Sequence, residues 1–292
     1  MILSLGVTGA LLFLLWWASH CEGAVFLLPT LAFAFLGLTS YALIHEACHD
    51  NLNSNQRING WLGALVGWLF PASFTFMKIA HQVHHRSNRT DGEMFDYYYP
   101  GDNLLIKYAQ WYSILIGIYP PIIPLGCLLM AFTPTVYRLK PWRAAKSSSI
   151  IFDRGLFDAA VVAVIRREVL LGIVFWVAVW RVLDLDFLAV AALYAAFWIN
   201  WSTRQYVTHA FSPRDVMNGA WNLRVSRLMG LIFLNGQWDL VHHNHPRVHW
   251  QHLPALGTSS QPPISYWRHY LKLWAGPRPN KEAAPMALDD IP

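Results

Sequence analysis

Two short histidine clusters in the first third of the chain have the residue types and spacing of metal ligands. The first contains His45 and His49 within HEACH, and the second contains His81, His84 and His85 within HQVHH. Residues at positions i, i+3 and i+4 lie on one face of a helix, so each cluster can direct two or three side chains at one point. Because neutral imidazole is the commonest nitrogen ligand of metals, the clusters predict a metal site between helices.

A third cluster repeats the spacing of the second with a carboxylate in first place. It contains Asp239, His242 and His243 within DLVHH. The combined set of eight or nine ligands is more than one ion uses and suits two ions with open coordination positions. Among the metals that imidazole binds, iron adds the oxygen chemistry that zinc lacks. The clusters therefore favour a site that activates O2 beside an apolar tunnel for a hydrocarbon chain or ring.

The first cluster also fits a different kind of site. HEACH matches the H-E-x-x-H pattern of zinc metalloproteases, in which Glu46 would act as general base. Zinc proteases use three protein ligands and a water, which would leave the second and third clusters without a role. A non-enzymatic metal transporter or sensor is another alternative, but it would carry histidines or carboxylates within its spans, and residues 24–44 and 187–201 contain none.

The composition indicates that these clusters belong to an integral membrane protein. The chain is 55% hydrophobic and only 13% charged, with a mean hydropathy of +0.29. Four apolar runs, residues 2–17, 24–44, 169–180 and 187–201, are candidate spans. The first run lacks the basic start of a signal peptide, so we expect it to be retained.

The basic residues predict which side of the membrane each segment faces. Of 22 Lys and Arg residues, Arg181 is the only one in a predicted outer loop. By the positive-inside rule, both termini and all the histidine clusters face the cytoplasm. The three cysteines show no paired spacing, so no disulfide framework is expected.

The segments between the spans require a less regular arrangement. We expect residues 60–80 to lie in the interface, residues 157–168 to form an interfacial amphipathic helix, and residues 104–136 to form a hairpin or re-entrant pair bent at Pro120, Pro121 and Pro124. The predicted fold class is an all-α integral membrane protein with about four transmembrane helices and a cytoplasmic cap. Residues 1–275 would form one domain, and residues 276–292 a flexible tail.

The order of the clusters resembles that of the membrane fatty acid desaturase and hydroxylase superfamily. HEACH, HQVHH, an isolated His209 and DLVHHNHP follow one another within residues 24–255. The resemblance implies a di-iron centre with O2 as cosubstrate. It implies as metal ligands His45, His49, His81, His84, His85, His209, Asp239, His242 and His243. Many relatives have histidine where this chain has Asp239, so His245 is an alternative ligand.

Several polar residues near the clusters are candidates for orienting the imidazoles. They are Asp50, Asn200, Gln205 and Asn244, for which helix capping and solvation are equal alternatives. Basic residues that could hold an acidic head group or acyl carrier are Arg138, Lys140, Arg143, Lys146, Arg166 and Arg167, although membrane topology alone explains them equally well.

The resemblance implies oxidation of a fatty acid or of an acyl-CoA, acyl-carrier or lipid derivative. It favours desaturation, with hydroxylation or decarboxylation to a terminal alkene as alternatives. The chain contains no glycine-rich dinucleotide loop, no CxxC pair and no fused cytochrome b5 motif. We therefore expect a ferredoxin-, rubredoxin- or cytochrome-type electron donor with its reductase. We expect no nucleic-acid partner, and the short chain favours a bacterial inner-membrane protein.

Overall fold

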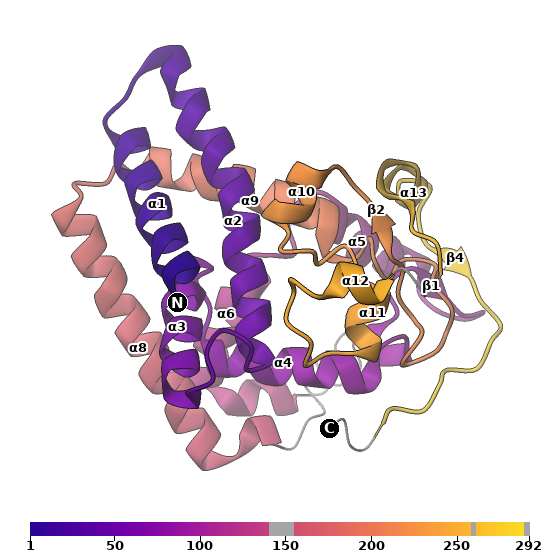
Figure 1. The fold of residues 1–292 in the computed structure, drawn as a ribbon. Coiled ribbons are helices and arrows are strands. Elements are labelled where there is room, and N and C mark those ends of the chain that lie inside the picture. Colours follow the sequence, from indigo (N-terminus) through magenta and orange to yellow (C-terminus); the bar gives the residue numbers. More distant parts are fainter. Residues whose placement is uncertain (140–154, 258–260, 289–292) are drawn as a thin grey trace.

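The computed structural model describes residues 1–139, 155–257 and 261–288, and Figure 1 shows their arrangement. Lys140, Arg143 and Lys146, predicted as basic contacts, lie outside the described residues. The fold is predominantly helical, as expected. It is not purely so, because two pairs of two-residue parallel strands join distant segments, β1 (Tyr97–Tyr98) with β4 (Arg278–Pro279) and β2 (Leu223–Arg224) with β3 (Ile264–Ser265).

An N-terminal helical hairpin leads into the first histidine cluster. It consists of α1 (Ile2–Ser19), the 3-10 turn η1 (Gly23–Phe26) and α2 (Leu27–Cys48). Both arms are long and apolar enough to cross a membrane. In Figure 1, α2 runs from the top of the hairpin down to α4, so its last turn delivers His45 to a junction between helices.

The second cluster lies on the second arm of a sharply bent pair, α3 (Gln56–Leu69) and α4 (Phe74–Ser87), whose axes differ by 97°. Glu168 fixes the start of α4, because its carboxylate accepts hydrogen bonds from Ser73 Oγ (2.6 Å), Thr75 N (2.9 Å) and Thr75 Oγ1 (2.7 Å). Anionic groups are stabilising at helix N-termini. The bend therefore sets the direction in which α4 presents its histidines.

The middle of the chain is broken near its prolines, as the sequence predicts. α5 (Leu104–Leu115) and α6 (Ile122–Phe132) are separate helices, and η3 (Pro134–Arg138) follows. The later helices are α8 (Ala159–Val182), which follows η5 (Gly155–Phe157), and α9 (Phe187–Gln205). The expected interfacial helix at 157–168 is instead the first part of the continuous α8.

In the described residues, two helices pass as candidate spans, or three if the bent pair is one span. The expected count of four is therefore not confirmed. α8 carries Arg166, Arg167 and Glu168 within its length, which leaves its uncharged part short. The tight packing of α2 on α9 is clear from Gly37, where an added β-carbon would overlap the ring of Phe197.

The last third of the chain gathers beside α4 and α5 on the right of Figure 1. Its helices are α10 (Arg227–Ile232), α11 (Asp239–Asn244), α12 (Leu253–Gly257) and α13 (Tyr266–Leu273). α10 is joined to the membrane hairpin by a hydrogen bond from Thr39 Oγ1 to Ile232 O (2.8 Å). In the segment predicted to be a flexible tail, Asn280 N donates to Tyr98 O (2.8 Å); the division of the chain at residue 275 stays a prediction.

Candidate metal centre

Eight of the predicted ligands form two groups that meet where α2, α4 and α11 come together. The ligand atoms in each group all lie within 4.8 Å of one another. The five-histidine group contains His45, His49, His81, His85 and His242. The three-histidine group contains His84, His209 and His243. The structure therefore divides the three clusters between two neighbouring sites.

The five-histidine group has the geometry of ligands around a cation. His81 Nε2 lies 2.6 Å from His49 Nε2 and 3.0 Å from His85 Nε2, and His85 Nε2 lies 3.1 Å from His242 Nε2. Two nitrogen ligands about 2.1 Å from one ion at a right angle are separated by about 3 Å. The convergence of these nitrogen atoms fits a metal ion at their centre.

Asp239 adjoins the three-histidine group. Its Oδ2 lies 3.1 Å from His209 Nε2 without hydrogen-bond geometry, and this buried oxygen has no hydrogen-bond partner in the described residues. Burial raises the pKa of Asp239 to about 6, an effect opposed by a hydrogen bond from Thr208. An orphaned buried carboxylate oxygen is unfavourable unless it is protonated or binds a cation. Asp239 therefore fits as a fourth ligand in this group.

The buried imidazoles outside the membrane helices are held in the neutral form that binds metals. Burial lowers the pKa of His209 to about 3 and that of His49 to about 4. Burial also lowers the pKa values of His242 and His243 well below their usual range. Protons therefore compete weakly with a metal for these nitrogens near neutral pH.

Two imidazoles are oriented by groups that the sequence did not indicate. His209 Nδ1 lies 3.1 Å from Gly219 O, and His84 Nδ1 lies 3.5 Å from Glu93 Oε2. A partner on Nδ1 fixes the tautomer that directs Nε2 toward the metal site. Glu93 lies outside the histidine clusters, so no spacing pattern pointed to it.

The predicted orienting residues have other roles or lie apart. Asn200 Nδ2 donates to Ala34 O (3.0 Å) and so joins α9 to α2, whereas Asp50 accepts from Lys78 Nζ (2.7 Å). The alternative ligand His245 is exposed and belongs to neither group. The remaining two candidates are Asn244, which is half-buried at the end of α11, and Gln205, which lines the cavity described below.

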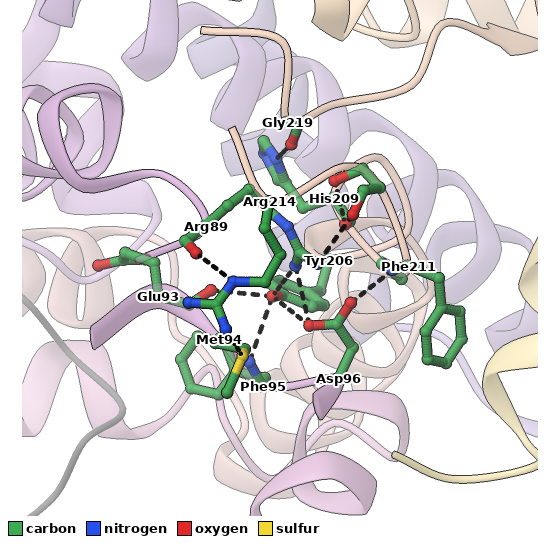
Figure 2. A network of polar contacts seen from close by, with 12 residues as sticks. Arg89, Glu93, Met94, Phe95, Asp96, Tyr206, His209, Phe211, Arg214 and Gly219 are labelled. Carbon is green, nitrogen blue, oxygen red and sulfur yellow. Dashed lines mark hydrogen bonds and ion pairs between the residues drawn. The ribbon is translucent and has the colours of Figure 1, made fainter. Parts of the chain in front are cut away.

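A buried polar network lies next to His209 of the three-histidine group (Figure 2). Arg89 and Asp96 are fully buried and form an ion pair of 2.8 Å. Tyr206 Oη accepts from Arg89 Nη1 (2.9 Å) and lies 2.9 Å from Glu93 O, while Asp96 Oδ2 accepts from Phe211 N (2.5 Å). The network thus fixes residues on both sides of His209 and the loop that carries Glu93.

Both histidine groups open onto one cavity of about 480 Å³, within the usual size range of small-molecule sites. One part of its wall, from α4, α6 and η3, is largely apolar: Phe76, Met77, Ile122, Ile123, Leu125, Gly126, Leu129 and Tyr137. The rest of the lining also contains polar side chains besides the histidines, among them Arg204 and Gln205 at the end of α9, Gln110, and the carboxylates of Glu46, Glu93 and Asp239. The cavity therefore suits a largely hydrocarbon molecule whose reacting carbon lies beside the histidines.

The arrangement does not favour the zinc protease alternative. Glu46 Oε2 accepts a hydrogen bond from Trp250 N (3.2 Å), and its Oε1 lies 4.0 Å from His45 Nδ1. One of its oxygens is therefore used structurally. The convergence of five histidines also exceeds the three protein ligands that a catalytic zinc uses.

Comparison with known proteins agrees with this site. The chain is 29% identical over 262 residues to a protein named Beta-carotene ketolase from Paracoccus sp., an alignment that covers 83% of this chain and 88% of the relative. The family model described as fatty acid desaturase matches residues 22–274. This match contains every residue of the two histidine groups, and the protein is accordingly an oxidoreductase of the fatty acid desaturase family.

Proposed function

We propose that the protein is a di-iron oxidase that uses O2 to oxidise an unactivated C–H bond in a fatty acid or fatty acyl substrate, and that the reaction is desaturation. The observation that carries this proposal is the opening of two adjacent ligand groups onto one largely apolar cavity. Family membership supports di-iron oxygenase chemistry. The lipid substrate and the reaction outcome are the proposed parts.

The residues would share the two irons according to the observed groups. The five-histidine group would hold one iron, and the three-histidine group with Asp239 would hold the other. Iron bound by imidazole and carboxylate ligands with open positions supplies oxygen activation and hydrogen abstraction. The chain's own contribution is to keep the imidazoles neutral by burial, to orient His84 and His209 through Glu93 and Gly219, and to limit water at the reacting carbon.

The cavity wall would hold the hydrocarbon part of the substrate. Tyr137 Oη donates to Gly126 O (2.8 Å), which joins η3 to α6 at this wall. A β-carbon added at Gly126 would lie 3.1 Å from the Tyr137 hydroxyl, so a larger residue there would require a small shift of that hydroxyl. Each methylene that the wall accommodates contributes about 0.8 kcal/mol of hydrophobic stabilisation.

A second candidate is oxygenation of a ring methylene. The support is the name of the relative, Beta-carotene ketolase, together with an alignment over most of both chains. Hydroxylation and oxidative decarboxylation remain further outcomes of the same site, since all begin by removing a hydrogen atom.

We further propose that an acidic electron-donor protein docks at a basic pocket next to the segment that follows His209. This second pocket, of about 600 Å³, has among its lining residues no carboxylate but four cations, Arg224, Arg268, Lys272 and Arg278. Its wall also contains Trp221 and His269, whose ring nitrogens lie 3.0 and 2.9 Å from Ala210 O, directly after His209. Complementary charge would steer an acidic iron–sulfur protein to this face.

The proposed topology places the α1–α2 hairpin and the α8–α9 pair in a bacterial inner membrane, with both termini and the histidine groups on the cytoplasmic side. The apolar arms of the first hairpin support membrane insertion. Cysteine accessibility at exposed Asp215 and at exposed Arg181 tests the orientation. Labelling of both positions from the same side would contradict it.

The experiment that tests the function combines metal and product analysis. Purified protein should contain about two irons per chain, and mass spectrometry of lipids and volatile hydrocarbons should show an O2-dependent product only in cells that express it. A His243→Ala variant is the matched inactive control. Zinc alone after iron-replete expression, or an unchanged lipid and hydrocarbon profile with a new oxygenated carotenoid, would reject the fatty-acyl proposal.

A further inference from the structure

Arg204, at the end of α9, places a positive charge in the wall of the cavity. No ion pair or hydrogen bond from its side chain occurs among the described residues. An unpaired charge in a protein interior is unfavourable unless a partner of opposite charge is supplied. A negatively charged molecule that enters the cavity would supply such a partner.

The guanidinium group is held in place by an aromatic ring rather than by a carboxylate. Its central carbon lies 3.1 Å from the centroid of the Phe233 ring, which is a cation–π contact. Burial raises the pKa of Asp239 and the charge of Arg204 opposes that rise, but the two side chains are not within ion-pair distance of each other. The contact with Phe233 holds the guanidinium without using its N–H groups as hydrogen-bond donors.

Two neighbouring polar groups on the same wall also lack partners. Trp201 Nε1 and Gln205 Oε1 are buried and have no hydrogen-bond partner among the described residues. Both residues line the cavity, and Trp201 is only 2% exposed. An indole N–H and an amide, which can present its NH2 group after rotation, are suitable donors to an anion. Three residues within one and a half turns of α9 therefore present polar groups to a largely apolar cavity.

We propose that Arg204, assisted by Trp201 and Gln205, binds the carboxylate of the substrate. The ligand class is an unesterified long-chain carboxylic acid, whose hydrocarbon chain would lie along α6. This inference rests on the proposed function in so far as the molecule held here is the one oxidised. A hydrocarbon without an oxygen function would leave the cation unpaired, so the site disfavours such a molecule.

The position of Arg204 also restricts which carbons reach the metal centre. It precedes His209 by five residues, and it lines the same cavity as Asp239 and His243 of the three-histidine group. A carboxylate bound there would present the carbons close to the acid end to the histidines. The products are therefore expected to be modified near the carboxyl group rather than in the middle of the chain.

The test compares decanoate with decanol on the purified protein with its metal retained, without O2 or electron donor. Equilibrium dialysis in a nonionic detergent at about pH 8, where carboxylic acids are ionised, measures both ligands. The variants are Arg204→Gln, Arg204→Lys, and Arg227→Gln, an exposed arginine on α10 that serves as the matched control. Comparing variants in the same detergent cancels the different partition of the two ligands into micelles.

Arg204→Gln should reduce the preference for decanoate over decanol by about 10- to 100-fold, as expected for a charge-assisted hydrogen bond. Arg204→Lys should retain part of the preference, and Arg227→Gln should retain all of it. An unchanged preference in Arg204→Gln with normal metal content would overturn the proposal. So would loss of both ligands equally, which would mark Arg204 as structural. Because the assay needs no turnover, it is decided independently of whether the protein is a di-iron oxidase.

Discussion

Replacing Asp239 by alanine would distinguish a metal ligand from a residue that only orients one. The three-histidine group with Asp239 offers four protein donors, of which Asp239 is the one anion. Loss of a residue that merely orients a ligand lowers metal affinity about 10- to 100-fold, or about 1.4 to 2.8 kcal/mol. Loss of the anionic ligand itself should exceed this range, so this iron should be lost during purification.

Asp239→Ala should therefore contain about one iron per chain where the parent protein contains about two. Elemental analysis against a quantified protein concentration measures this directly. Asp50→Ala is the matched control, because Asp50 is next to His49 but pairs with Lys78 outside both groups. Full iron with reduced turnover in Asp239→Ala would assign an orienting role. Full iron and full turnover would refute both roles.

Further predictions concern the other ligands, the supporting network and the basic pocket. His84→Ala should abolish turnover and lower iron content while circular dichroism stays unchanged; retained turnover would remove His84 from the site. Asp96→Asn should lower the free energy of unfolding by about 3 to 5 kcal/mol, because it leaves a buried guanidinium without its counter-ion, and denaturant titration that shows no change would contradict the ion pair. In metal-free protein the pKa of His209 is about 3 in the folded state and 6.5 in the unfolded state, so the unfolded chain takes up the proton first as pH falls. Stability should therefore decrease by about 2 kcal/mol for this group between about pH 6.5 and about pH 5, and a rise in stability on acidification would show the sign to be wrong. Reversing the charges of Arg268 and Lys272 to glutamate should raise the KM for an acidic ferredoxin about tenfold and flatten its salt dependence, with iron content unchanged; an unaltered KM would place the docking site elsewhere.

The structure brings the side chains of the clusters together, as helical spacing predicts, and their role as metal ligands stays a prediction. How the histidines divide between two groups was not predicted. His84 and His85 separate into different groups, as do His242 and His243. Adjacent residues on a helix diverge by about 100°, so each neighbouring pair can serve both sites at once. Assigning the members, however, required the relative positions of α2, α4 and α11.

The residues that sequence reasoning missed share a physical reason. Glu93 and Gly219 reach their histidines from irregular segments, where no periodic pattern reports proximity. The sequence did not predict a role for Arg204, because a single arginine in the last turn of a helix is common and its role depends on its surroundings. The charged residues within α8 likewise interrupt its apolar run, so a prediction from uninterrupted apolar runs did not identify the long helix.

The hydrogen bonds that Glu168 accepts at the start of α4 have a consequence for biosynthesis. The bend that directs the second histidine cluster is fixed by Glu168 of α8, which follows its partners Ser73 and Thr75 by 95 and 93 residues. The five-histidine group is itself incomplete until His242 has left the ribosome. A metal ion can therefore have its full set of five histidines only in an almost finished chain, so products that end before His242 should contain less metal than the chain that includes it.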